Sequence, residues 1–321
     1  MRYYEETNPP DIEESVVLAT IQSIFSKIEN PQVRFLYHGT YNVYIVENQY
    51  IFRFPSTYHP PKKRREYVRS EVKLLQILGN HLDTPIPEPK FVDLDTDYPY
   101  MGYRMIPGAP LTLHYLDAPP AQHQILGNQL GHFIGAFHSI PETILDDEAD
   151  SFTPEVYRRE QSEIFNRVQD LAYPHMSTQQ RDWTGTLFNS FLDNDENFEF
   201  EPVITHGDLY SVNILVDPET LNLTGIIDFE SVRLYDPAID FIFLREGTVL
   251  LSSIIEAYPH KIDPNLGDRA AYFIGKQPFF YSLKGLDFCL ERMEKFGYDR
   301  ITDHMKNWDY FMKVCKESFK E

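Results

Sequence analysis

The chain has 321 residues, of which 49 are acidic and 29 are basic, so its formal net charge is −20 at pH 7. A charge of this sign repels phosphate backbones and anionic membranes, so neither nucleic acid nor a membrane is an expected partner. Hydrophobic residues make up 42% of a chain longer than a single core usually supports. We therefore expect a folded, two-lobed protein whose acidic surface either keeps it soluble or attracts cationic ligands.

The cysteines and the N-terminus bear on the expected compartment. Cys289 and Cys315 are too few for a disulfide framework and lack metal-ligand spacing, which predicts free thiols in a reducing compartment. The first ten residues carry Glu5, Glu6 and two prolines and no apolar core, and no stretch reaches the roughly 20 apolar residues of a membrane span. We expect a soluble cytoplasmic protein.

The N-terminal third combines helical and strand patterns. Apolar residues at near-helical spacing predict a helix over 11–29 and another over 62–78, the latter with Glu71 near its middle. Short β-rich runs bounded by turn residues or prolines predict strands over 33–37, 41–46, 50–54, 91–94 and 100–106. Together these elements predict a small lobe with an antiparallel sheet.

Beyond Pro107-Gly108 the pattern becomes mainly helical. Apolar stripes predict helices over 122–139, 154–171 and 177–192. The expected fold class is therefore α+β, with a small antiparallel-sheet lobe over 1–106 and a mostly helical lobe over 107–321.

Polar residues interrupt two apolar runs between Val203 and Phe229. Strand ends near Thr205 and Ile227 would bring Asp208, Asn213 and Asp228 close together. Two carboxylates and an amide oxygen are hard ligands that suit Mg²⁺. Phosphoryl transfer needs a metal on the phosphates and a carboxylate that orients the attacking hydroxyl. Asp208 fits the catalytic carboxylate, and Asn213 and Asp228 fit the metal ligands.

The same residues carry a family resemblance. His206-Gly207-Asp208 with Asn213, and Ile227-Asp228-Phe229, resemble the catalytic and metal motifs of the aminoglycoside phosphotransferase family, which is similar to the protein kinases. Glu230 stands where a kinase has the glycine that follows the metal motif. The resemblance implies a protein-kinase-like fold and transfer of the terminal phosphoryl of ATP or GTP, with Mg²⁺, to a hydroxyl.

The resemblance also implies a nucleotide site in the small lobe. Arg53 occupies the third-strand position where the kinase-like pattern has a lysine that touches phosphates, and Glu71 would be its partner. A surface Arg–Glu pair is the alternative. The turn at Gly39 would be a reduced glycine loop, or a plain hairpin turn. The backbone of Met105 and Ile106 would face a purine edge.

Acidic residues after the metal motif suggest the acceptor. Glu230, Asp236 and Glu246 favour a cationic small molecule such as an aminoglycoside, because carboxylates pair with protonated amines. By resemblance, Asp240 would brace the catalytic loop. Macrolide, homoserine, choline and sugar-amine kinases share this chemical core, and a catalytically silent ligand-binding module is the alternative from a different class.

Overall fold

A computed structural model describes residues 9–113, 118–145, 152–287 and 289–319. The chain divides into two compact units: the first takes in residues up to 114 together with 211–230, and the second takes in 115–210 together with 231–321. The expected lobe boundary near residue 106 stays a prediction. The first eight residues, part of the N-terminal stretch considered above, lie outside the described residues. None of the described helices combines the length and the apolar composition needed to cross a membrane.

The first unit contains the five strands predicted from the sequence. Its elements in chain order are α1 (Glu14–Ile24), β1 (Val33–His38), β2 (Tyr41–Val46), β3 (Tyr50–Pro55), α2 (Pro61–Leu78), β4 (Pro89–Asp93), β5 (Tyr100–Arg104), β6 (Ala109–Pro110), η1 (Leu111–Leu113), β8 (Ile214–Val216) and β9 (Leu223–Ile226). The large sheet has the order β1-β2-β3-β5-β4, and each neighbouring pair is antiparallel. This confirms the predicted antiparallel sheet.

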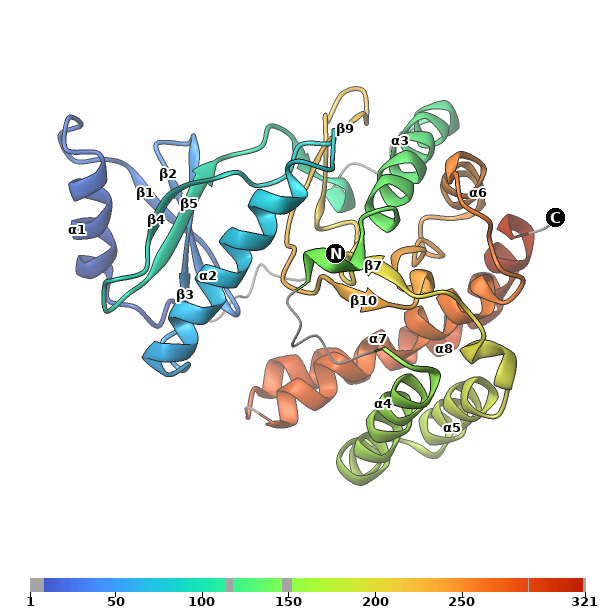
Figure 1. Cartoon of the computed structure of the whole chain (residues 1–321). Helices are drawn as coiled ribbons and strands as arrows, with labels where there is room; N and C mark the ends of the chain where they lie inside the picture. The colour runs from blue at the N-terminus through green and yellow to red at the C-terminus, as the bar shows by residue number, and fades with distance from the viewer. Residues whose placement is uncertain (1–8, 114–117, 146–151, 288, 320–321) are drawn as a thin grey trace. The chain divides into compact units, whose positions relative to one another are not determined.

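A helix covers each face of this sheet (Figure 1). On one face, Val17 and Ile21 of α1 pack into a buried cluster with Phe52 and Phe54 of β3. Because side chains alternate along a strand, Arg53 points to the opposite face, where α2 packs on β3, β4 and β5. Alternation along β3 thus separates an aromatic core from a face that can carry charge.

The second sheet of this unit joins segments that are distant in sequence. β8 lies between β6 and β9, with Ala109 opposite Val216 and Ile214 opposite Ile226. The amide of Ile226 also donates to the carbonyl of Pro85 at 3.0 Å. The sequence indicated the strand that ends near Ile227, which is β9, but not the two-residue strand β6. The β8–β9 hairpin therefore belongs to the same unit as Arg53.

The second unit is mainly helical. Its elements in chain order are α3 (Pro120–His138), η2 (Glu142–Ile144), α4 (Pro154–Arg167), the π-helical turn η3 (Val168–Ala172), η4 (Tyr173–His175), α5 (Thr178–Leu192), η5 (Asp195–Phe198), β7 (Val203–Thr205), β10 (Arg233–Tyr235), η6 (Pro237–Asp240), α6 (Thr248–Ala257), α7 (Leu266–Asp287) and α8 (Glu291–Ser318). The three helices predicted in this part are present. Strand β7 pairs with β10, an antiparallel pair that the sequence did not indicate.

Glycines on α3 set how closely α6 can approach. Gly127 and Gly131 lie one turn apart on this helix. A Cβ on Gly127 would lie 2.5 Å from Ser253 Cβ, and a Cβ on Gly131 would lie 2.4 Å from the Ile254 carbonyl oxygen. Such distances are impossible for real side chains, so the two helices pack in direct backbone contact. Figure 1 shows α3 and α6 side by side in this arrangement.

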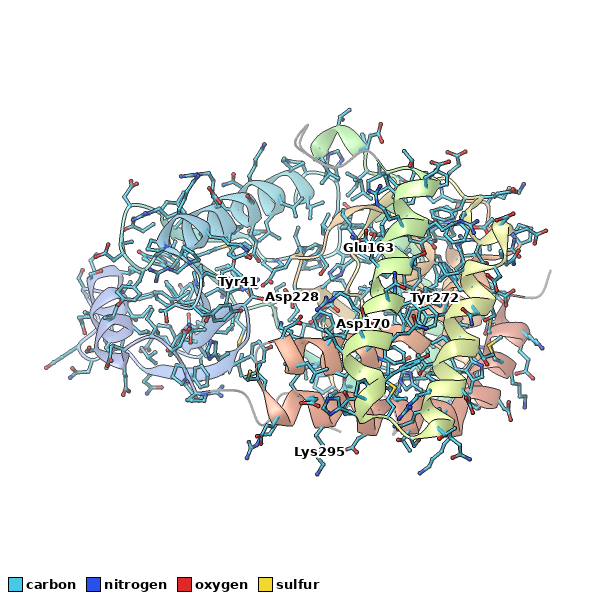
Figure 2. All side chains as sticks on the ribbon, turned by 90° about the horizontal axis from the view of Figure 1, so that it is seen from below. Tyr41, Glu163, Asp170, Asp228, Tyr272 and Lys295 are labelled. Carbon is cyan, nitrogen blue, oxygen red and sulfur yellow. The ribbon has the colours of Figure 1, made fainter. Side chains whose placement is uncertain are left out.

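Aromatic side chains and one buried ion pair form the centre of this unit. Tyr272 of α7 stacks on Phe191 with ring centroids 3.7 Å apart, and Figure 2 labels Tyr272 among the helices. Asp236 and Arg269 are both fully buried, and Arg269 Nε lies 2.9 Å from an Asp236 carboxylate oxygen. The Tyr157 hydroxyl donates to the same carboxylate at 2.9 Å. Both charges are thus paired and hydrogen-bonded, as buried charges must be.

We predict that Asp236→Ala lowers the free energy of unfolding by about 3 kcal/mol, because it removes one partner of a buried charge pair. Urea denaturation followed by tryptophan fluorescence measures this change. Both tryptophans, Trp183 and Trp308, lie in the second unit. The control is Asp195→Ala, which breaks an ion pair with Arg158 at the surface, where the Asp195 side chain is 87% exposed. This substitution should lower the free energy of unfolding by less than about 1 kcal/mol. Equal effects of the two substitutions would contradict the prediction.

Candidate active site

Arg53 is a buried cation at the centre of a charged cluster. Its side chain is 8% exposed and forms a hydrogen-bonded ion pair with Glu71 of α2, which is 6% exposed. The ring of Tyr41 lies over the guanidinium at 4.2 Å. The Arg53–Glu71 pair is therefore buried, unlike the surface pair considered as an alternative, and sequence reasoning did not foresee the contribution of Tyr41.

Two acidic residues of the segment after β9 also face Arg53. Its Nη2 atom bonds a carboxylate oxygen of Glu230 and lies 3.6 Å from Asp228 Oδ1. In Figure 2, Tyr41 and Asp228 are labelled in this part of the first unit. Partial burial raises the pKa of Glu230 to about 7; Arg53 opposes this shift, and Asp228 and Glu71 add to it. The guanidinium stays charged, because the carboxylates more than offset the effect of burial on its pKa.

The β8–β9 hairpin sets the positions of Asn213 and Asp228. The amide of Ile227 donates to the Asn213 carbonyl at 3.0 Å, which holds the residues just before β8 and just after β9 together. Asp228 has φ +71°, a left-handed conformation that is uncommon outside glycine, asparagine and aspartate. Asp228 Oδ1 is buried and accepts no hydrogen bond. A buried carboxylate oxygen without a donor fits a cation ligand.

A divalent cation here would need further oxygen ligands. The described residues contain no cluster of three or more histidine, cysteine, aspartate or glutamate side chains suited to hold a metal ion. Mg²⁺ commonly takes one or two protein ligands and completes its shell with water and substrate phosphates. Asp228 and Asn213 fit this mode of binding, in which the nucleotide itself supplies the remaining ligands.

The loop containing Asp208 belongs to the second unit. Gly207 has φ +75°, and a Cβ there would lie 2.7 Å from the Ser231 carbonyl oxygen, so glycine is required. The buried Asp240 accepts from the amides of His206 at 2.8 Å and Gly207 at 2.9 Å. His206 Nδ1 in turn accepts from the Asp208 amide at 3.3 Å. Asp240 thus braces this loop, as expected, and His206 adds a bond within it.

The other predicted nucleotide contacts lie at turns of the first unit. The Gly39 amide donates to the Tyr41 carbonyl at 3.0 Å, which closes the β1–β2 turn. The Met105 amide donates to the Gln49 carbonyl at 2.7 Å. A hydrogen bond between Met105 and a purine would therefore use the Met105 carbonyl. Ile106 is buried. Their contact with a purine remains a prediction.

A hydrogen-bond network that the sequence did not reveal holds the β1–β2 turn in place. Asp11 accepts from Asn42 at 2.6 Å, from the Thr57 amide at 2.7 Å and from the Ser56 hydroxyl. His38 Nε2 lies 3.0 Å from Ser56 Oγ. No spacing in the sequence connects Asp11 with a turn about thirty residues later, so only the folded chain identifies this anchor.

The three acidic residues expected at the acceptor occupy different surroundings. Glu230 bonds Arg53 in the first unit, and Asp236 is fully buried with Arg269. Glu246 is partly exposed and follows Arg245 in the second unit. The contacts of Asp236 favour a structural role, and those of Glu230 favour a role beside Arg53.

Solved structures with this arrangement of elements are enzymes of the protein-kinase-like fold. The GDP complex of wild-type aminoglycoside 2'-phosphotransferase-IIIa matches with a TM-score of 0.79 and 22% identity over 92% of this chain and 99% of that chain. The apoenzyme of a macrolide 2'-phosphotransferase from Brachybacterium faecium matches with a TM-score of 0.70 and 18% identity over 89% and 98%. At these identities the likeness establishes the fold, which is α+β with an antiparallel-sheet lobe and a helical lobe.

The model of the phosphotransferase enzyme family (APH) matches residues 32–271. The chain belongs to this family. A curated relative, the aminoglycoside 3'-phosphotransferase of Streptomyces ribosidificus, is 42% identical over 52 residues, which are 16% of this chain. That match spans only 20% of the relative's length.

We predict that Asp240→Asn loosens the loop over 206–208, because an amide keeps one acceptor oxygen where the carboxylate uses two. Hydrogen exchange of the His206 and Gly207 amides should accelerate about tenfold. The control is Asp217→Asn in an exposed turn, where the Asp217 carboxylate accepts hydrogen bonds from the Glu219 and Thr220 amides. Unchanged exchange in Asp240→Asn would show that the brace is dispensable.

Proposed function

We propose that this protein transfers the terminal phosphoryl group of ATP or GTP, with Mg²⁺, to a hydroxyl group of a small molecule. The observation that carries this proposal is the buried cluster in which Arg53 lies between Glu71 and Glu230, beside the unbonded oxygen of Asp228. Membership of the phosphotransferase enzyme family supports it. Similar structures contain GDP, ADP or ATP.

Arg53 would hold the nucleotide phosphates. Its guanidinium is fixed by the Glu71 carboxylate and by the ring of Tyr41, so little side-chain entropy remains to be lost on binding. The turn at Gly39, anchored through Asp11, would cover the phosphates. The backbone at Met105 and Ile106 would meet the base.

Asn213 and Asp228 would hold Mg²⁺, which when bound neutralises charge on the phosphate oxygens. The left-handed Asp228 directs one carboxylate oxygen toward Arg53 and leaves it without a hydrogen bond. The cost of this geometry is of order 1–3 kcal/mol and is typical of functional positions. Asp228 is therefore arranged for binding in advance of its ligand.

Asp208 would orient the acceptor hydroxyl and accept its proton. Asp240 and His206 hold the backbone on which this carboxylate depends. Positioning of this kind supplies most of the catalysis in phosphoryl transfer, since the transition state needs little covalent help.

For the acceptor, an aminoglycoside or similar cationic molecule is the first candidate. Similar structures contain kanamycin or gentamicin, and the net charge of −20 favours cations. Macrolides, homoserine, choline and amino sugars are the alternatives. A cytoplasmic location belongs to this proposal, and both Cys289 and Cys315 are free thiols.

The test is a panel of these acceptors with ATP and with GTP, in the presence and absence of Mg²⁺, followed by mass spectrometry of the products. A phosphorylated product that requires Mg²⁺ supports the proposal. Binding of a panel member without any product would favour the silent ligand-binding module instead.

We predict that Asp208→Asn leaves nucleotide affinity unchanged and lowers kcat at least about 100-fold, because it removes the proton acceptor. Asp228→Ala should instead weaken Mg-ADP binding, measured by calorimetry, because it removes a metal ligand. Asp217→Asn serves as the control for both. Retained turnover in Asp208→Asn would refute its assigned role.

Glu230→Gln separates two roles for Glu230. If its carboxylate competes with nucleotide phosphates for Arg53, the neutral amide should tighten ADP binding about threefold to tenfold in EDTA. If Glu230 binds the acceptor, ADP affinity should stay constant and the acceptor KM should rise. We predict the first result. Glu66→Gln, at an exposed pair with Lys62 on α2, is the matched control.

A further inference from the structure

A short N-terminal segment, residues 9–11, is hydrogen-bonded to the end of the large sheet that carries the β1–β2 turn. The Pro9 carbonyl accepts from His38 Nδ1 at 2.7 Å, at the last residue of β1. The Asp11 amide donates to Asn42 Oδ1 at 3.1 Å, and Asn42 Nδ2 donates to Asp11 Oδ1 at 2.6 Å. We call residues 9–11 the N-terminal strap, because they hold both strands that flank the turn.

The strap also holds the segment that follows β3. The Thr57 amide donates to Asp11 Oδ2 at 2.7 Å, and the Thr57 hydroxyl donates to the Asp11 carbonyl at 3.0 Å. The Ser56 hydroxyl donates to the same carboxylate, and the Ser56 amide donates to the Thr40 carbonyl in the turn at 2.8 Å. Asp11 is therefore the residue through which β2, the turn and the end of β3 are joined.

Asp11 accepts these bonds as a charged carboxylate. Burial alone would raise the pKa of this carboxyl, but hydrogen bonds from Ser56, Asn42 and Thr57 outweigh burial, so the pKa lies below its usual value. A carboxylate only accepts hydrogen bonds, so all three neighbours can direct an N–H or O–H group at it. An amide at this position would turn an N–H group toward either Asn42 Nδ2 or the Thr57 amide, and both of these are donors.

The strap acts on the residue that lies over Arg53. Tyr41 and Asn42 are adjacent on β2, so their side chains point to opposite faces of the sheet. Asn42 is fixed by Asp11 on one face. On the other face, the centre of the Tyr41 ring lies 4.2 Å from the Arg53 guanidinium. Because the two residues share one stretch of backbone, the position of Asn42 sets that of Tyr41.

We propose that the N-terminal strap, through Asp11, holds the β1–β2 turn and Tyr41 in the geometry that binds nucleotide phosphates, and thereby sets the nucleotide affinity. This inference rests on the proposed function and adds a positioning residue to it. Asp11 acts through Asn42 and Ser56, so it orders the site before the ligand arrives. A site that is ordered in advance loses less conformational entropy on binding.

The sign of the effect separates positioning from charge. Nucleotide phosphates are anionic, so removing a negative charge from the first unit should, by electrostatics alone, strengthen binding slightly or leave it unchanged. Loss of the strap should instead weaken binding. A weaker affinity after neutralisation of Asp11 would therefore report lost positioning.

Calorimetry of Mg-ADP binding to the full chain tests the proposal by exchanging two side chains. Asp11→Asn should weaken binding about tenfold, because the amide meets Asn42 or Thr57 with a second donor. Asn42→Asp should weaken it as well, because two carboxylates then face each other. In the double variant, the new amide can donate to the new carboxylate and keep its oxygen for Ser56 and Thr57, at unchanged net charge. Its affinity should return to within about threefold of the wild type.

Two control variants measure general effects of charge and of stability. Glu13→Gln removes the same charge from an exposed residue two positions after Asp11 and should leave the affinity unchanged. Val17→Ala removes buried volume from α1, on the face of the sheet opposite Arg53, so it should lower thermal stability and leave the affinity of the folded protein unchanged. Unchanged affinity in a folded Asp11→Asn variant, or a double variant as weak as Asp11→Asn, would overturn the proposal.

Hydrogen exchange tests the same coupling in the wild type, so a folding defect in a variant cannot obscure the result. If the strap raises nucleotide affinity, bound nucleotide must stabilise the strap to the same degree. The Thr57 amide, whose acceptor is Asp11, should therefore exchange about tenfold more slowly at saturating Mg-ADP. The Glu219 amide, in the exposed turn between β8 and β9, is the control. Unchanged exchange of the Thr57 amide would overturn the proposal.

Equilibrium binding also separates this inference from the proposed function. ADP binding that depends on Asp11, without phosphoryl transfer to any acceptor, would uphold the strap and refute the kinase. Phosphoryl transfer with an ADP affinity independent of Asp11 would uphold the kinase and refute the strap. A wild-type protein that binds no ADP would refute both.

Discussion

The first unit depends on placing one cation, Arg53, where water is almost absent. Burying a lone guanidinium would be prohibitive, and the ion pair with Glu71 together with the contacts to Glu230 and Asp228 removes that cost. These partners come from α2 and from the segment after β9, so one charge links the sheet, the helix and the hairpin. Loss of Arg53 would leave three carboxylates facing one another.

The second unit also buries charged side chains, and it neutralises them with different partners. Asp236 and Arg269 are paired with each other in its core, while Asp240 accepts hydrogen bonds with both carboxylate oxygens from the backbone amides of His206 and Gly207. Asp236 directly precedes η6, and Asp240 is the last residue of η6. A single short turn thus joins the stability of the helical core to the shape of the loop that carries Asp208.

Local patterns in the sequence predicted much of this molecule. The strands β1 to β5 and the helices α1 to α5 follow from alternation and helical spacing, because each buries one face. The motif around Asp208, Asn213 and Asp228 indicated the family. Long-range electrostatics were beyond prediction: nothing in the sequence tells that Glu230 contacts Arg53, 177 positions away, or that Asp236 is buried.

The first unit consists of two separate stretches of the chain, and this affects the order in which it is completed during synthesis. Strand β6 pairs with β8, which is about one hundred residues later in the chain, and residues 115–210 between them belong to the second unit. During synthesis, α3, α4 and α5 leave the ribosome before the strands that complete the first unit. Arg53 therefore lacks Asp228 and Glu230 until the hairpin has been synthesised. Completion of the first unit is thus a late event in the biosynthesis of this protein.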